Sequence, residues 1–185
     1  MTTPRIKAIG YCANDTEPGE WAFSLALDMA SRHRLQLNIF QFVSDPYRDG
    51  DGADPEVTAA DRNAVDLVEM EKRLRLHYDD LLGEYTDVGF RLCEDNEWTE
   101  LHRCLCKQEF QLLVMANPYP NTLFGKRTLV DFARNFVSPV VLVGPTAPTE
   151  LSLNAPAKLV AYRVGLEKSP KKVTTTTETL PYHQL

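Results

Sequence analysis

Four consecutive residues combine cationic side chains with groups that hold anions in proteins. Gly125, Lys126, Arg127 and Thr128 stand at the start of a helix predicted for about residues 127–136. A glycine lets backbone amides approach a phosphate closely, and the amides at a helix N-terminus favour negative charge. Lysine and arginine add charge-assisted hydrogen bonds. The segment therefore predicts anion binding, and the alternative is a solvated helix start without a ligand.

Three more candidate residues, Tyr11, Cys12 and Asn117, lie where two predicted strands end. Residues 5–11 read as a short strand, and residues 110–116 are nearly continuous in apolar residues, as in a strand covered on both faces. Parallel sheets bind ligands beyond the carboxyl ends of their strands, where the strand order reverses. We expect the three residues at such a crevice. Tyr11 and Cys12 either line a modified pocket there, or the Tyr11 ring fills it.

Patterns for catalysis and for metal binding are weaker. A Cys12 nucleophile requires a nearby base, and no histidine stands near either pocket segment in the sequence. His102 and Cys106 share a helical face, but Cys104 points elsewhere and no second cluster completes a tetrahedral zinc site. The sequence contains no Walker loop, no G-x-G-x-x-G and no H-E-x-x-H motif. We therefore expect neither an enzyme nor a metal protein.

The composition is that of an acidic globular protein. Of its 185 residues 43% are hydrophobic, the formal net charge is -6, and the pI is near 5.2. That charge argues against nucleic acid and anionic membranes as partners. No run of about 18 apolar residues predicts insertion into a membrane, and the N-terminus shows no apolar signal core. We expect a cytoplasmic protein with reduced cysteines.

Strand-like and helix-like segments alternate along most of the chain. This alternation predicts a parallel sheet with right-handed crossovers and helices on both faces. The expected fold is a Rossmann-like three-layer α/β sandwich with five mainly parallel strands. The predicted strands are about 5–11, 35–43, 87–93, 110–116 and 140–144, and the predicted helices are about 19–33, 56–85, 97–108 and 127–136.

Other stretches depart from this pattern. Residues 44–55 are rich in Asp, Gly and Pro and predict a surface loop, and residues 117–125 predict a second loop. After residue 144, prolines punctuate a polar stretch in which residues 158–164 (KLVAYRV) read as one more strand, and a polar tail of low complexity follows. We therefore divide the chain into an α/β domain, 4–144, and a C-terminal extension, 145–185.

Three segments resemble the universal stress proteins. Residues 6–27 (IKAIGYCANDTEPGEWAFSLAL) are similar to the opening strand, loop and helix of that family. Residues 112–117 (LLVMAN) are similar to its penultimate strand, and residues 131–143 (DFARNFVSPVVLV) to its last helix and final strand. With the order of the elements, the similarity spans about residues 4–144. The resemblance implies the same α/β fold and a regulatory role in the stress response.

The positions that hold nucleotide in the family's ATP-binding branch are largely changed in this chain. That branch ends its first strand in an acidic residue, whereas no acid appears here before Asp15. It also carries Gly-x-x-Gly after the fourth strand and then Gly-Ser or Gly-Thr, of which Gly125 and Thr128 are partial matches. Pro118 and Pro120 remove two amide donors from the loop. The resemblance therefore implies the fold without the family's usual nucleotide site.

Two functions follow from these departures. The first is a non-enzymatic regulatory or adaptor protein that acts through contacts with an unknown protein partner and needs no cofactor. The alternative is a sensor that binds an adenine nucleotide or another anion at the loop and N-terminus of helix 127–136.

The resemblance also implies a homodimer through the final strand, 140–143. That strand is apolar and without charge, and an uncovered apolar edge invites aggregation, so it should be paired or covered. Residues 158–164 are expected either to cover this edge in their own chain or to reach across to a partner's.

Overall fold

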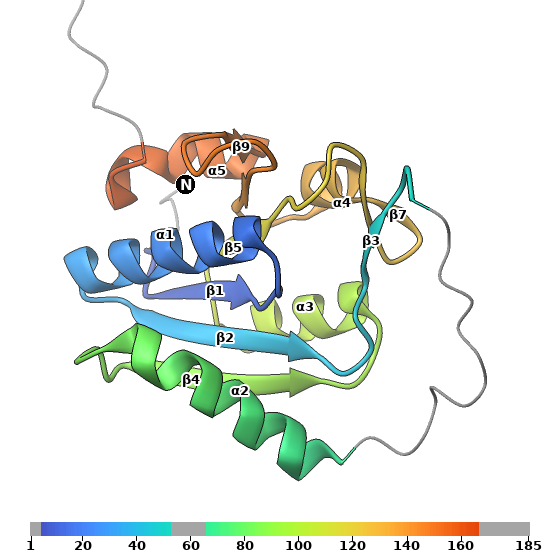
Figure 1. Cartoon of the computed structure of the whole chain (residues 1–185). Helices are drawn as coiled ribbons and strands as arrows, with labels where there is room; N and C mark the ends of the chain where they lie inside the picture. Colours follow the sequence, from blue (N-terminus) through green and yellow to red (C-terminus); the bar gives the residue numbers. More distant parts are fainter. Residues whose placement is uncertain (1–4, 53–65, 167–185) are drawn as a thin grey trace, which may run out of the picture.

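A six-stranded sheet forms the centre of the computed structural model, which describes residues 5–52 and 66–166 (Figure 1). The order of its strands is β4-β2-β1-β5-β8-β9, and every neighbouring pair is parallel except β8 and β9. The strands are β1 (Ala8–Cys12), β2 (Gln36–Phe42), β4 (Val88–Cys93), β5 (Leu112–Ala116), β8 (Val140–Val143) and β9 (Leu151–Leu153). The predicted α/β sandwich is confirmed, with one strand more than expected.

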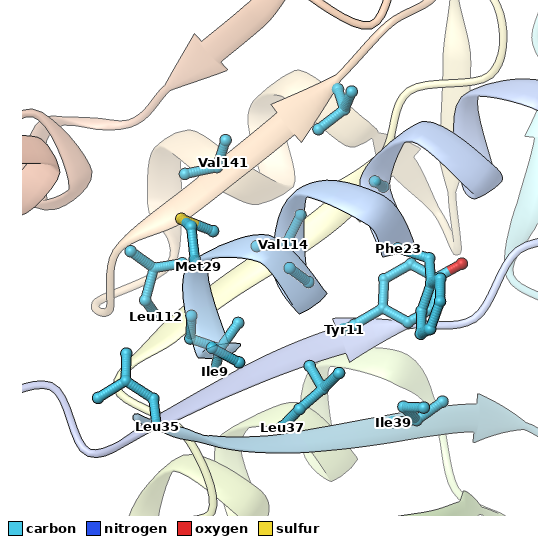
Figure 2. Packing of buried hydrophobic residues seen from close by; sticks show 14 of the residues in the cluster. Ile9, Tyr11, Phe23, Met29, Leu35, Leu37, Ile39, Leu112, Val114 and Val141 are labelled. Atoms are coloured by element: carbon cyan, nitrogen blue, oxygen red, sulfur yellow. The ribbon is translucent and has the colours of Figure 1, made fainter. Parts of the chain in front are cut away.

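Helices cover both faces of this sheet and enclose two apolar cores. The helices are α1 (Glu17–His33), α2 (Leu67–Leu82), α3 (Glu97–Cys106), α4 (Leu129–Asn135) and α5 (Ala155–Val160). Ile9 and Tyr11 of β1 belong to the core beneath α1, α2 and α5, where Figure 2 shows Tyr11 beside Phe23 of α1. Cys12 belongs to the opposite core, beneath α3 and α4. Adjacent residues of one strand therefore serve different layers, as the alternation of a pleated strand requires.

Helix α1 begins and ends as its sequence indicates. The Thr16 hydroxyl accepts a hydrogen bond from the Gly19 amide at 3.2 Å, and Pro18 lies in the first turn, where its missing N–H has no cost. Arg34 ends the helix in a left-handed conformation at φ 55°. The helix starts at Glu17, two residues before the predicted start at 19. Helix α2 begins at Leu67, and the predicted helical start at 56 lies outside the described residues.

A second, smaller sheet forms from the two segments predicted as loops and from the first two residues of the predicted helix 127–136. Strands β3 (Tyr47–Asp49), β6 (Thr122–Phe124) and β7 (Arg127–Thr128) pair antiparallel in the order β3-β6-β7. Figure 1 shows β3 and β7 beyond the arrowheads of the main strands. This three-stranded sheet therefore lies at the carboxyl edge of the main sheet.

The extension after β8 folds onto the main sheet, but not as predicted. Residues 158–164 are helical, because α5 and the 3-10 helix Ala161–Val164 replace the expected strand. Asn154 caps α5 by accepting from the Ala157 amide at 3.0 Å, and Pro156 stands in its first turn. The added strand is β9 instead, which begins at Leu151, seven residues before the expected start at 158.

Asn154 also connects this extension to the rest of the protein. Its side-chain oxygen accepts from the Val140 amide at 2.9 Å, and its amide group donates to the carbonyl oxygens of Ala133 and Ser138, both at 2.9 Å. One side chain thus holds the end of α4, the start of β8 and the start of α5 together.

Strand β8 is paired on both sides within the described chain. Val141 and Leu142 face β5 partners on one side and β9 partners on the other. The predicted homodimer through strand 140–143 therefore finds no open edge there for pairing across a two-fold axis. The strands at the ends of the described sheet are β4 and β9.

Candidate functional site

The loop after β5 is held closed by its own polar groups. The Thr122 hydroxyl donates to the side-chain oxygen of Asn117 at 2.8 Å, and the amide of Tyr119 donates to the Thr122 hydroxyl at 3.0 Å. Thr122 is buried. Asn117, which was predicted to face a ligand, therefore serves as an acceptor within its own loop.

The smaller sheet uses the backbone amides that a phosphate would need. The amide of Gly125 donates to the carbonyl oxygen of Pro46 at 3.0 Å. The amide of Gly50 donates to the carbonyl oxygen of Asn121 at 2.8 Å. Gly125 has φ +62°, a conformation that favours glycine, and a Cβ added there would overlap the carboxylate of Glu97. An anion at Gly125 would therefore approach a carboxylate and find the amide already bonded.

The cationic residues after Gly125 lie on the surface. Lys126 and Arg127 are exposed, and the Arg127 guanidinium lies 5.0 Å from the ring centre of Trp98, within cation–π range. Thr128 caps α4, because its hydroxyl accepts from the Asp131 amide at 3.2 Å. Each of the four residues Gly125 to Thr128, which were predicted to bind an anion, therefore has a structural role or faces solvent.

Tyr11 fills the end of β1 on the α1 and α2 side. Its hydroxyl donates to the Gly19 carbonyl oxygen at 2.9 Å and lies 3.2 Å from the Tyr78 hydroxyl, and its ring packs against Phe23 with 5.5 Å between ring centres (Figure 2). Burial raises the pKa of Tyr11, and the neighbouring Tyr78 raises it further. Of the two alternatives left by the sequence, the ring that fills the site agrees with this geometry.

Cys12 is fully buried in the opposite core and lines no crevice with Tyr11. Burial, and to a lesser extent Cys104, raises the pKa of its thiol. A nucleophilic cysteine acts as the thiolate, which this environment disfavours.

The histidine and cysteines of α3 are divided between core and surface. Cys104 is buried, Cys106 is exposed, and the His102 ring packs 5.3 Å from the Trp98 ring centre. Within residues 5–52 and 66–166, no group of three His, Cys, Asp or Glu side chains is placed to hold a metal ion.

An open cavity that the sequence did not indicate lies over the carboxyl ends of β1 and β2. It has a volume of about 470 Å³ and is bounded by Asn14, Asp15 and Gln41 from these strand ends and by Arg73 and His77 from α2. Asn14, Asp15 and Gln41 follow or end predicted strands, so the strand-end rule points to this edge. The sequence alone does not place α2 above it, and the cavity therefore escaped prediction.

A second cavity of about 480 Å³ continues from the first between α1 and α2. Asn14, Asp15, His77 and Tyr78 line both cavities, so the two form one depression along the edge of β1. The buried Tyr11 ring forms part of the wall of the second cavity, so it fills the end of β1 and also lines the depression. The depression carries carboxylates on α1 and apolar side chains at its base.

Comparison with solved structures finds similar folds. A universal stress protein in complex with cAMP is 14% identical, with a TM-score of 0.49 over 77% of this chain and 100% of its own. Universal stress protein UspA from Lactobacillus plantarum is 15% identical, with a TM-score of 0.47 over 76% of this chain and 99% of its own. Both of these structures are of universal stress proteins. No protein-family model matches the chain, and no curated protein does.

No described helix is long and apolar enough to cross a membrane.

Proposed function

We propose that this chain is a regulatory or adaptor protein with the fold of the universal stress proteins, which acts through protein contacts and neither binds nucleotide at the loop after β5 nor catalyses a reaction. The observation that carries the proposal is the three-stranded sheet β3-β6-β7. It occupies the loop where the family's ATP-binding branch holds phosphates, and it uses the Gly125 amide in a bond to Pro46.

Opening this loop for a phosphate would cost several interactions at once. Phe124 is fully buried and packs against Tyr47 and Phe132, with 4.9 and 4.8 Å between ring centres. Displacing β6 would expose that ring and leave the Gly125 amide and Thr122 hydroxyl without their present partners. The free energy gained by binding an anion would have to exceed the free energy lost with these interactions. Pro118 and Pro120 have no backbone amide to donate to the anion.

A second function has one observation in its favour. The cavity over β1 and β2 contains hydrogen-bonding groups of Asn14 and Gln41 and the guanidinium of Arg73, beside three carboxylates, those of Asp15, Asp66 and Glu69. Arg73 is 3.3 Å from Glu69, with both side chains largely exposed, so the pair can open at little cost. A sensor of a small anion or nucleotide would use this cavity.

Titration of the full chain distinguishes the two functions. We expect ATP, AMP, cAMP and inorganic phosphate to leave the melting temperature unchanged at millimolar concentration, because a ligand that binds the native state raises it. A dissociation constant in the micromolar range, about -8 kcal/mol, would contradict the adaptor proposal. Loss of that affinity in Arg73→Gln, but not in Lys126→Ala with Arg127→Ala, would assign the ligand to the open cavity.

A homodimer stays part of the proposal, with its interface away from the paired edges of β8. Strand β4, at the end of the described sheet, has six residues and offers a longer free edge than the three residues of β9. Light scattering of the full chain at several concentrations is expected to give the mass of two chains. A constant mass of one chain would remove the dimer from the proposal.

A further inference from the structure

The depression between α1 and α2 combines an apolar base with an acidic rim. Its cavity of about 480 Å³ is lined by the apolar side chains of Phe23, Leu27 and Tyr78 and by the carboxylates of Asp15, Glu20 and Asp28. We call this surface the acidic groove. A peptide that fits it needs positive charges spaced along a segment that also carries an apolar side chain.

The carboxylates of the acidic groove are poorly neutralised. Neither Asp15 nor Glu20 forms an ion pair with any residue in the part of the chain that the structure describes, whereas Asp28 is 2.8 Å from Arg32. Both unpaired carboxylates also lie close enough to Tyr78 to add to the rise in the pKa of its hydroxyl, of which burial is the larger cause. The groove therefore presents a negative potential to a cationic occupant.

The last described residues of the chain lie beside one end of this groove. Leu166 packs on the core, and a Cβ at Gly165 would lie 3.7 Å from Nε2 of His33, the last residue of α1. Ser31, two residues earlier on α1, lines the near end of the groove. In Figure 1 the red end of the extension accordingly lies above the end of α1 that is distant from the arrowheads.

The sequence that follows Leu166 has the chemistry that the groove requires. Residues 167–173 read EKSPKKV, with Lys168, Lys171 and Lys172 ahead of one apolar residue, Val173. An extended chain covers about 3.3 Å per residue, so Lys171 can reach roughly 16 Å from Leu166. The distance along α1 from Ser31 to Glu20 is also roughly 16 Å at about 1.5 Å per residue.

We propose that residues 167–173 occupy the acidic groove of their own chain, with the three lysines against Asp28, Glu20 and Asp15. The proposal does not depend on whether nucleotide binds at the loop after β5, because the groove lies outside that loop.

A zero-length carbodiimide cross-linker applied to the full chain tests this directly, because it joins lysine amines only to carboxylates in contact. We expect links from Lys171 and Lys172 to Glu20 and Asp15 within single chains, identified by mass spectrometry at low ionic strength. Asp79 and Asp80, exposed on α2 and outside the groove, supply the matched control carboxylates. Equal yields at the control carboxylates, or links that join two chains, would overturn the proposal, the second result in favour of another copy's tail.

Limited trypsin digestion of the full chain gives an independent measure. Cleavage after Lys171 and Lys172 should become roughly fivefold to tenfold faster in Asp15→Asn with Glu20→Gln, as expected when two or three exposed ion pairs are lost. High salt should have the same effect on the parent chain. Asp79→Asn with Asp80→Asn removes the same charge and should leave the rate unchanged. An equal rate in all three proteins would show that the segment is not held in the groove.

Discussion

The carboxyl edge of the sheet differs between its two halves. Over β1 and β2 it is open, with two joined cavities bounded by α1 and α2. Over β5 it is closed, because β6 pairs with both β3 and β7 and the Phe124 ring of β6 packs against Phe132 of α4. Both halves belong to the crevice in which parallel sheets bind ligands.

The difference shows that the three-layer fold is compatible with a carboxyl edge that is packed with side chains over β5 and open over β1 and β2. Phe124, at the centre of the closed half, is fully buried, whereas Asp15 in the open half is exposed. The closed half contains aromatic rings, prolines and internal hydrogen bonds, and the open half contains polar groups around two cavities. Fold and ligand site are therefore separable here, and function must be argued from the site.

The largest expected effect comes from opening the closed half. Phe124→Ala removes a ring that packs against Phe42, Tyr47 and Phe132, and should lower the free energy of unfolding by about 3–5 kcal/mol. Leu123→Ala, in the same strand but only partly buried, is the matched control and should cost clearly less. Urea denaturation measures both. An equal loss of unfolding free energy in the two variants would mean that the aromatic cluster around Phe124 does not stabilise the closed half.

Alkaline pH should destabilise both halves together. Burial raises the pKa values of Tyr11, Tyr47 and Tyr78, so the folded protein keeps phenolic protons that the unfolded chain loses near pH 10. The stabilisation from these neutral hydroxyls is complete below pH 10 and is lost as the pH rises above it. Thermal unfolding between pH 8 and 11 should show a melting temperature that is level at first and then falls. Tyr11→Phe should make that fall less steep.

The hydroxyl groups of two tyrosines, one in each half, differ in their hydrogen bonding. Tyr11, in the open half, donates to the Gly19 carbonyl oxygen, whereas the buried Tyr47 hydroxyl of β3 has no hydrogen-bond partner among the described residues. Tyr11→Phe should therefore cost about 1 kcal/mol, and Tyr47→Phe should be neutral or slightly stabilising. Chemical denaturation at pH 7 measures the pair, and a larger cost at Tyr47 would indicate a partner that the closed half conceals.

The smallest effect is expected at the cationic residues next to the closed half. Lys126→Ala with Arg127→Ala removes exposed side chains and one cation–π contact with Trp98, so we expect a loss of about 1 kcal/mol or less. If any anion raises the melting temperature of the parent chain through this segment, the double variant should abolish the rise. An unchanged rise would place the anion elsewhere, with the open cavity the first alternative.

The elements with strong local patterns could be predicted from the sequence. The continuous apolar run ending at Ala116 predicted β5, and the predicted start of α1 at residue 19 lies within two residues of its observed start at Glu17. Strands β3 and β6 have three residues each and pair across more than 70 positions, so no local periodicity reveals them. Residues 158–164 were expected to form one more strand, but the Asn154 cap and Pro156 start a helix just before them.

The candidate site was less predictable because its residues depend on distant partners. Arg127 was read as an anion ligand, and its neighbour Trp98 stands on a different helix. Tyr11 was left with two roles, and the position of Tyr78 on α2 favours the ring that fills the site. The open cavities depend on how α2 lies over the strand ends, which follows from packing between elements and not from any one segment.

The pairing of β9 with β8 also has a consequence for the order in which the chain is made. A ribosome adds about 5–20 residues per second, so the ten residues from Val143 to Leu153 take roughly half a second to two seconds. During that interval β8 has been synthesised and the strand that covers it has not. Its apolar edge is then available to other nascent chains. The risk of misassociation is therefore set by the pace and crowding of synthesis, while the finished protein no longer exposes that edge.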